Sequence, residues 1–354
     1  MERLVKYRCG LVAQVWTLAA ALTILLPSIA RGDQATHEFT LASTTLIVGS
    51  LEYHEVSRRV AHLDLTVTAQ SAAFAREPVL GENGVRRGWL RCGMPGEKPM
   101  AFIWDTGQGR LYLDLNRNED LTDDPDGVFT AAARGESRYQ TFAEVRLILP
   151  TDAGSFPMLL DLTLTAFGSV RVRGDLRSFH SGQVTFDDLE WHLGVVARSG
   201  SELLSLAGTS LLLRPWVERD QAFEVRGDAT DAFPFSSDLF FRGRGYRVSG
   251  SFDFEVSPPV CRLKFIEQPV TPGQLEVRGQ HIHRLILRDG PWMVVLDEPA
   301  GTIPVPAGSY AAHMVQLRHG DARAYPQVWP ADRGIQRQTV IEPGQPIELV
   351  VAGH

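Results

Sequence analysis

Strict alternation of apolar and polar residues recurs along this chain and constrains its fold more than any other feature. It is clearest at residues 63–68, 160–165 and 252–256, which read Leu-Asp-Leu-Thr-Val-Thr, Leu-Asp-Leu-Thr-Leu-Thr and Phe-Asp-Phe-Glu-Val. Successive side chains of a strand point to opposite faces, so each segment forms one apolar and one polar face. No segment has a convincing helical repeat, and the best helix candidate is Leu51 to Val60. We therefore expect an all-β fold built from antiparallel β-sandwich domains.

The N-terminal residues 1–30 are typical of a secretory signal peptide. Three basic residues precede an apolar run from Leu11 to Leu26, and Ser28-Ile29-Ala30 supplies the small-x-small pattern of a cleavage site. The apolar run is shorter than the roughly 20 residues that a membrane-spanning helix needs. We expect a cleaved signal, a secreted or periplasmic protein, and no membrane span after cleavage.

The charge balance of the remaining chain argues against two classes of partner. Residues 1–30 hold three basic residues and one acidic residue, and without them 32 Lys and Arg stand against 41 Asp and Glu, a net charge of −9. Nucleic acids and anionic membranes attract basic surfaces. Neither is therefore an expected partner.

The length after signal cleavage exceeds what one hydrophobic core usually holds, so we expect two domains. A boundary is predicted at residues 267–273, where two prolines and a glycine interrupt the strand pattern. The predicted domains are residues 36–266, which are β-rich and could form two subdomains, and residues 274–354. The second suits an immunoglobulin-like or transthyretin-like sandwich.

Two cysteines, Cys92 and Cys261, remain after signal cleavage and could pair in an exported protein. One disulfide in a chain of this length would not be a folding framework. Whether they pair stays open, because the sequence gives no Cα separation.

An acidic segment between residues 114 and 126 is the strongest candidate site. It holds six carboxylates, with only Arg117 inside it to offset their repulsion. Ca²⁺ takes six to eight oxygen ligands, which closely spaced Asp, Asn and Thr side chains can supply. The alternative is a solvated turn, since Asn and Asp favour turns without a metal. We favour calcium, with the following candidate ligands: Asp114, Asn116, Asn118, Asp120, Thr122, Asp123 and Asp124.

The oxygens at alternate positions resemble the calcium loops of EF-hands and dockerins. Asp114, Asn116 and Asn118 match loop positions one, three and five, but position six is Glu119 instead of glycine and position twelve is Pro125 instead of glutamate. A strand, not a helix, is expected to enter the loop at residues 110–113. The segment is thus similar to loops of uncharacterised exported bacterial β-rich proteins. In the arrangement that this resemblance implies, Asp123, Asp124 or Asp126 replaces the missing glutamate. A metal that holds a loop stabilises the folded state by mass action, so we expect its role to be structural and not catalytic.

Other motifs give weaker indications of chemistry. Asp105-Thr106-Gly107 resembles the triplet of aspartic proteases, but the chain lacks the second triplet that the reaction requires, so a hairpin turn at residues 105–110 is preferred. His281-Ile282-His283 places two imidazoles on one face of a predicted strand, and a solvated face is preferred over a zinc site. No catalytic residue is predicted.

The sequence therefore predicts a calcium-stabilised binding or structural protein at the cell exterior, with an extracellular protein or glycan as its partner. The alternative is an extracellular hydrolase, or the accessory carbohydrate-binding module of a polymer-degrading system. A cleft with two perturbed carboxylates would favour the enzyme, and a flat surface with exposed tryptophan would favour binding. Docking onto a partner through the acidic loop is a third hypothesis.

Overall fold

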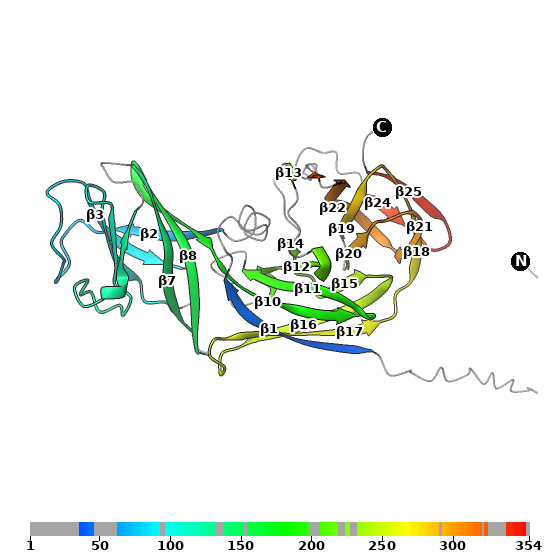
Figure 1. The fold of residues 1–354 in the computed structure, drawn as a ribbon, viewed down its shortest axis with the longest axis horizontal. Helices are drawn as coiled ribbons and strands as arrows, with labels where there is room; N and C mark the ends of the chain where they lie inside the picture. Colours follow the sequence, from blue (N-terminus) through cyan, green and yellow to red (C-terminus); the bar gives the residue numbers. More distant parts are fainter. Residues whose placement is uncertain are drawn as a thin grey trace, which may run out of the picture. The chain divides into compact units, whose positions relative to one another are not determined.

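The prediction of an all-β fold is confirmed. Apart from 3-10 turns at η1 (Pro125–Gly127), η3 (Leu206–Gly208) and η4 (Trp216–Glu218), every regular element of the described residues is a strand (Figure 1). The described part of the chain holds no helix of the length and apolarity needed to cross a bilayer. The predicted signal peptide and the helix candidate at 51–60 lie outside it. The computed structural model describes residues 35–45, 62–92, 96–131, 138–151, 154–197, 206–218, 224–226, 232–289, 292–320, 322–324 and 338–351.

An eight-stranded antiparallel sheet carries the acidic loop. Its strand order is β6-β5-β4-β3-β2-β9-β8-β7, so β7 and β6 form its two edges. Its strands are β2 (His62–Ala69), β3 (Val85–Arg91), β4 (Met100–Asp105), β5 (Arg110–Leu113), β6 (Val128–Thr130), β7 (Tyr139–Thr151), β8 (Gly154–Phe167) and β9 (Ser169–Leu176).

A second, fourteen-stranded sheet contains most of the remaining strands. Its order is β13-β23-β22-β19-β20-β15-β16-β17-β1-β10-β11-β12-β14, with β24 paired to β22. Its strands are β1 (Thr36–Thr45), β10 (Ser178–Phe186), β11 (Leu189–Ala197), β12 (Thr209–Pro215), β13 (Glu224–Arg226), β14 (Ala232–Pro234), β15 (Asp238–Phe241), β16 (Arg244–Asp253), β17 (Val260–Gln268), β19 (Ile282–Asp289), β20 (Trp292–Asp297), β22 (Gly308–His319), β23 (Ala322–Ala324) and β24 (Thr339–Ile341).

A third sheet has the order β21-β18-β25, from β18 (Pro272–Arg278), β21 (Gly301–Pro306) and β25 (Pro346–Val350). The predicted boundary at 267–273 joins β17 to β18. Strand β15, before that boundary, pairs in parallel with β20, after it. Backbone hydrogen bonding therefore links the two predicted segments.

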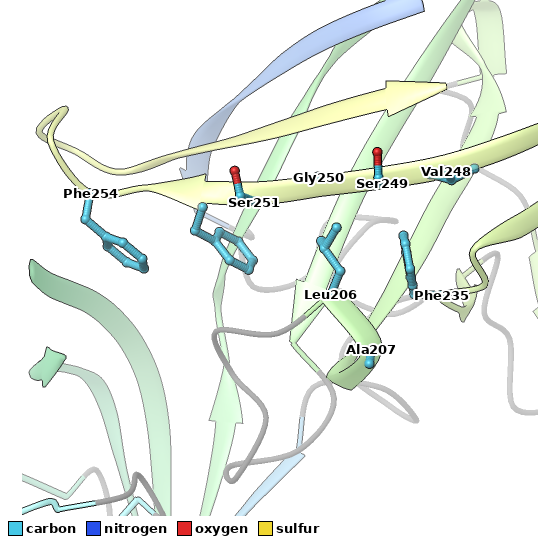
Figure 2. Close-up of a pocket in the computed structure, with 9 residues that line it drawn as sticks. Leu206, Ala207, Phe235, Val248, Ser249, Gly250, Ser251 and Phe254 are labelled. Carbon is cyan, nitrogen blue, oxygen red and sulfur yellow. The ribbon is translucent and has the colours of Figure 1, made fainter. Parts of the chain in front are cut away.

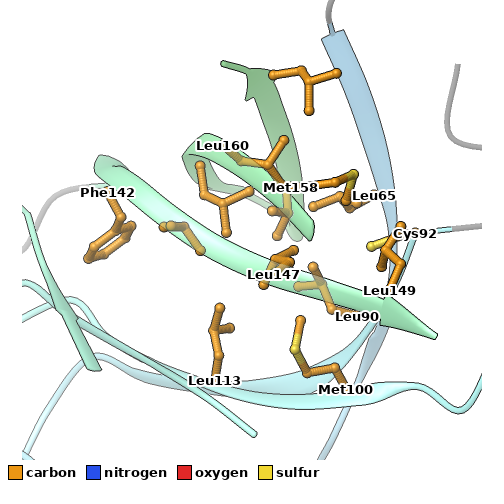
Figure 3. Packing of buried hydrophobic residues seen from close by; sticks show 14 of the residues in the cluster. Leu65, Leu90, Cys92, Met100, Leu113, Phe142, Leu147, Leu149, Met158 and Leu160 are labelled. Carbon is orange, nitrogen blue, oxygen red and sulfur yellow. The ribbon is translucent and has the colours of Figure 1, made fainter. Parts of the chain in front are cut away.

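The alternating pattern of β8 shows how the sequence builds the core. Leu160, Leu162 and Leu164 are fully buried, whereas Thr163 and Thr165, on the opposite face, are partly exposed. The leucines pack with apolar side chains of the neighbouring strands, including Phe142 and Leu147 of β7 (Figure 3). Burying one such side chain contributes about 1.5–3 kcal/mol, so this face dominates the stability of the sheet.

Two predictions about strands are wrong in detail. The expected strand at 252–256 ends at Asp253, because the Asp253 carboxylate accepts the N–H of Glu255 and turns the chain there. His281 and His283 do not share a strand face. His281 adopts a left-handed backbone (φ 61°) before β19 begins and its Nδ1 lies 3.3 Å from Nδ1 of His319, whereas His283 is buried.

Cys92 and Cys261 are buried in two different apolar clusters, and neither forms a disulfide in the described part of the chain. Burial raises the pKa of each thiol to about 12. Both therefore act as small apolar core residues at neutral pH.

Candidate metal-binding loop

Strand β5 leads directly into the acidic loop, as the sequence predicts. It pairs with β4 through a hairpin turn at residues 105–110, and the N–H of Asp114 continues that pairing by donating to the carbonyl of Ala101 at 2.9 Å. Leu121, in the second half of the loop, is buried against Ala101, Ile103 and Tyr112. The loop is therefore fixed to the sheet at its start and in its second half.

The Asp114 carboxylate is the centre around which the loop folds. Its side chain is fully buried; Oδ1 accepts the N–H of Asn118 at 3.0 Å and Oδ2 accepts the N–H of Glu119 at 2.9 Å. Hydrogen bonds to an ionised acceptor are about twice as strong as neutral ones. One aspartate thus closes the first half of the loop.

A series of local turns continues from Asp114. The side-chain oxygen of Asn116 accepts the N–H of Asn118, that of Asn118 accepts the N–H of Asp120, and that of Asp120 accepts the N–H of Thr122, at 2.8–3.0 Å. Each is an Asx turn, in which a side-chain oxygen accepts the backbone N–H of the residue two positions ahead. The alternate oxygens found in the sequence are therefore the groups that shape this loop.

Two non-glycine residues of the loop have positive φ, Arg117 at 61° and Glu119 at 70°. Glu119 occupies position six, where an EF-hand loop carries glycine to allow its sharp turn. The left-handed conformation is uncommon for residues other than glycine. Here the hydrogen bond from Glu119 N–H to Asp114 supports it, so the sequence departure at position six does not prevent the sharp turn.

Asp123 brings three of the predicted ligands together. Its Oδ1 accepts a hydrogen bond from Nδ2 of Asn116 at 3.2 Å, and its Oδ2 accepts one from Nδ2 of Asn118 at 2.7 Å. All three side chains offer oxygen atoms, the donor type that Ca²⁺ takes.

Asp124 lies close enough to Asp114 and Asp123 to feel their charges. Burial raises the pKa of its carboxyl above the ordinary 3.8, and the Asp114 and Asp123 carboxylates raise it further, against hydrogen bonds from the backbone of Asn116 and Leu115. Its Oδ2 is buried and has no hydrogen-bond partner among the described residues. A neighbouring cation would relieve both the repulsion and the unpaired oxygen.

Two of the predicted ligands point elsewhere. Asp120 forms an ion pair with Arg76 at 2.9 Å through Oδ2, and its Oδ1 accepts the hydroxyl of Thr122. The hydrogen bonds from Thr122, and to a smaller extent the contact with Arg76, lower the pKa of Asp120. In the structure these two side chains therefore serve the turn and the contact with Arg76, and only the backbone carbonyl of Asp120 would suit position seven.

Sequence reasoning missed three residues that support the loop. Arg76 contacts Asp120, and its carbonyl accepts the N–H of Leu121 at 3.2 Å. Glu97 forms a buried ion pair with Arg117 at 3.4 Å, and the ammonium of Lys98 donates to the carbonyl of Arg117. All three lie outside the loop in sequence, so no local sequence pattern predicts their contacts with it.

The donor set fits a hard cation only if amide and carbonyl oxygens take part. No group of three or more Asp, Glu, His or Cys side chains that could hold a metal occurs among the residues that the structure describes. Asp114, Asn116, Asn118, Asp123 and Asp124 combine carboxylates with amides, a mixture that calcium accepts and magnesium, with its stricter octahedral geometry, fits less well.

The aspartic-protease resemblance has a structural explanation. The Asp105 carboxylate is fully buried and accepts the N–H groups of Gly81 at 2.7 Å and Gln108 at 2.9 Å, so it holds the hairpin turn. Beside it, Nε1 of Trp104 donates to Gln140 at 2.6 Å. The described tryptophans are buried or half-buried, so none of them forms an open stacking platform.

A separate apolar pocket of about 480 Å³ lies beside β16. Its lining holds Leu206, Phe235, Phe252 and Phe254 but no Asp, Glu, His or Lys. Figure 2 shows the hydroxyl groups of Ser249 and Ser251 on the side of β16 opposite to Leu206 and Phe235. The lining of this pocket therefore supplies no titratable acid or base.

Comparison with protein-family models, with curated proteins and with solved structures finds no match to the chain.

Proposed function

We propose that this chain is an exported β-sandwich protein whose loop from Asp114 to Asp124 binds calcium, and that it serves as a binding or structural module at the cell exterior. Export is supported by the signal-like residues 1–30. The role assigned to the metal is structural, because it would brace the loop that follows β5. Extracellular calcium is millimolar, a range in which even weak sites fill.

The observation that carries the proposal is the unbalanced charge around the buried Asp114 carboxylate. The Asp114 and Asp123 carboxylates both act on Asp124, and the buried Oδ2 of Asp124 has no hydrogen-bond partner within the described residues. Like charges at this range repel. Calcium would bind Asp114, Asn116, Asn118, the carbonyl of Asp120, and Asp123 or Asp124.

Calorimetric titration of the calcium-free protein with CaCl₂ tests the proposal. We expect one binding event per chain in the wild type, loss of that event in Asp114→Asn, and its retention in the control Glu38→Gln. Glu38 is an exposed carboxylate on β1 that pairs with Lys264. Absence of binding in the wild type, or equal binding by Asp114→Asn, would show that the loop is an acidic turn without a metal.

A further inference from the structure

The solvent-facing side of strands β7, β8 and β9 carries a row of polar and aromatic side chains. Tyr139 lies opposite Thr165, and Thr165 lies opposite Arg171. Directly opposed residues of antiparallel strands project to the same face. The three side chains therefore cross three neighbouring strands, over about 10 Å at the usual strand spacing.

A second polar row lies beside the first. Thr141 is opposite Thr163, which is opposite Arg173, and the two threonine hydroxyls are 3.1 Å apart. The other face of the same strands carries the buried Leu162 and Leu164. The apolar side is thus used by the core, while the polar side faces solvent.

These rows form a groove of about 440 Å³. That size is within the range of small-ligand sites. Its polar and aromatic lining residues come from all three strands: Tyr139, Thr163, Thr165, Arg171, Arg173 and Asp175.

Two exposed aromatic rings lie on this face of the sheet, and one of them, Tyr139, lines the groove. Tyr139 is 56% exposed, and Phe167, which shares the face of Thr165 two residues along β8, is 68% exposed. An exposed aromatic ring presents a face of partial negative charge to solvent. The polarised C–H groups on one side of a pyranose ring complement such a surface.

The charges in the groove leave one cation available. Arg173 is paired with Asp175 at 3.2 Å, whereas exposed Arg171 has no carboxylate within ion-pair distance among the described residues. A planar guanidinium binds a carboxylate through two parallel hydrogen bonds. Asp175 beside it lines the same groove and can accept sugar hydroxyls.

We propose that this groove binds a polysaccharide containing uronic acid. Arg171 binds the uronate carboxylate, Tyr139 stacks on a sugar ring, and Thr163, Thr165 and Asp175 take the ring hydroxyls. The inference rests on the proposed location of the chain at the cell exterior, where such polymers occur. It does not require calcium in the loop after β5.

Titration calorimetry of the full chain with hexagalacturonate tests this site. We expect Arg171→Ala to weaken binding by about tenfold or more, the loss that follows from one charge-assisted pair. Arg171→Lys keeps the positive charge but not the planar guanidinium, so its affinity is expected to lie between those of the wild type and Arg171→Ala. Tyr139→Ala is expected to weaken binding as well. The matched control is Arg288→Ala, which removes an exposed arginine on β19 of another sheet.

Two further ligands define the chemical class: neutral maltohexaose, which lacks the carboxylates, and hexaglutamate, which lacks the sugar rings. Each is expected to bind at least about tenfold more weakly. The proposal is overturned if wild type does not bind hexagalacturonate, if Arg171→Ala binds it as tightly as Arg288→Ala does, or if maltohexaose or hexaglutamate binds the wild type as tightly as hexagalacturonate. A thermal melt of each sample, with and without chelator, separates this outcome from the proposed function. If the stability depends on calcium but uronate does not bind, only the proposed groove site is refuted. If uronate binds but the stability does not depend on calcium, only the proposed metal site is refuted.

Discussion

Replacing Asp114 by asparagine is expected to destabilise the protein by different amounts with and without calcium. The fully buried carboxylate accepts two backbone N–H groups, from Asn118 and Glu119. Asn118 N–H keeps a second acceptor in Asn116, at 3.0 Å. The N–H of Glu119 is accepted by the Asp114 carboxylate. In Asp114→Asn this N–H loses its acceptor when the side-chain NH₂ group of the new asparagine faces it.

The expected magnitudes follow from these contacts. Without calcium, the substitution weakens one charge-assisted hydrogen bond and costs about 2 kcal/mol. With calcium at a hundred times its dissociation constant, the wild type gains a further ~2.7 kcal/mol that the variant lacks. An unfolding entropy of ~2.1 cal/mol/K per residue over roughly 320 residues converts these energies to melting-temperature differences of about 3 °C in chelator and about 7 °C in calcium.

Differential scanning calorimetry of both proteins, in EDTA and in CaCl₂, measures the two differences. Glu38→Gln is the matched control and is expected to show the same calcium response as the wild type. An equal loss for Asp114→Asn in both buffers would refute the reasoning, because the carboxylate would then be a structural acceptor and not a metal ligand.

Three other predictions follow from the structure. Burial and neighbouring charges raise the pKa of Asp124 above 3.8, so its ionised form opposes folding, and the stability of the calcium-free protein falls as pH rises through that pKa. Asp124→Asn should therefore raise the melting temperature in EDTA at about pH 7, and this increase should disappear below the ordinary pKa. A variant that is less stable than the wild type at pH 7 would contradict the prediction. Gly127→Ala should cost about 2 kcal/mol in urea unfolding, because its Cβ would lie 2.2 Å from the carbonyl oxygen of Leu113; an unchanged midpoint would show that the turn shifts freely. Cys92 and Cys261, with pKa values of about 12, should react with Ellman's reagent at about pH 8 only after unfolding, and rapid reaction of the native protein would contradict their burial.

Local patterns in the sequence were sufficient to predict much of this fold. The strand at 110–113, the hairpin at 105–110 and the loop from Asp114 depend on alternation and on Asx side chains that bond within a few residues. Such features need no information about distant parts of the chain. The same holds for the inward leucines of β8.

Features that depend on distant contacts were not predictable in this way. The ion pair between Arg76 and Asp120 joins residues 44 apart, and the groove at Tyr139 and Arg171 depends on the register of three strands. A single residue with positive φ, His281, was enough to break an alternation that looked regular in the sequence. Register and backbone conformation are set by packing, which a single sequence does not display.

A crystal structure of the protein grown in calcium, with anomalous data, would test the central claim most directly. We expect one strong anomalous peak, with oxygens of Asp114, Asn116, Asn118 and either Asp123 or Asp124 about 2.3–2.6 Å away. A loop with the same hydrogen bonds as here and only water at its centre, in crystals containing saturating calcium, would contradict it.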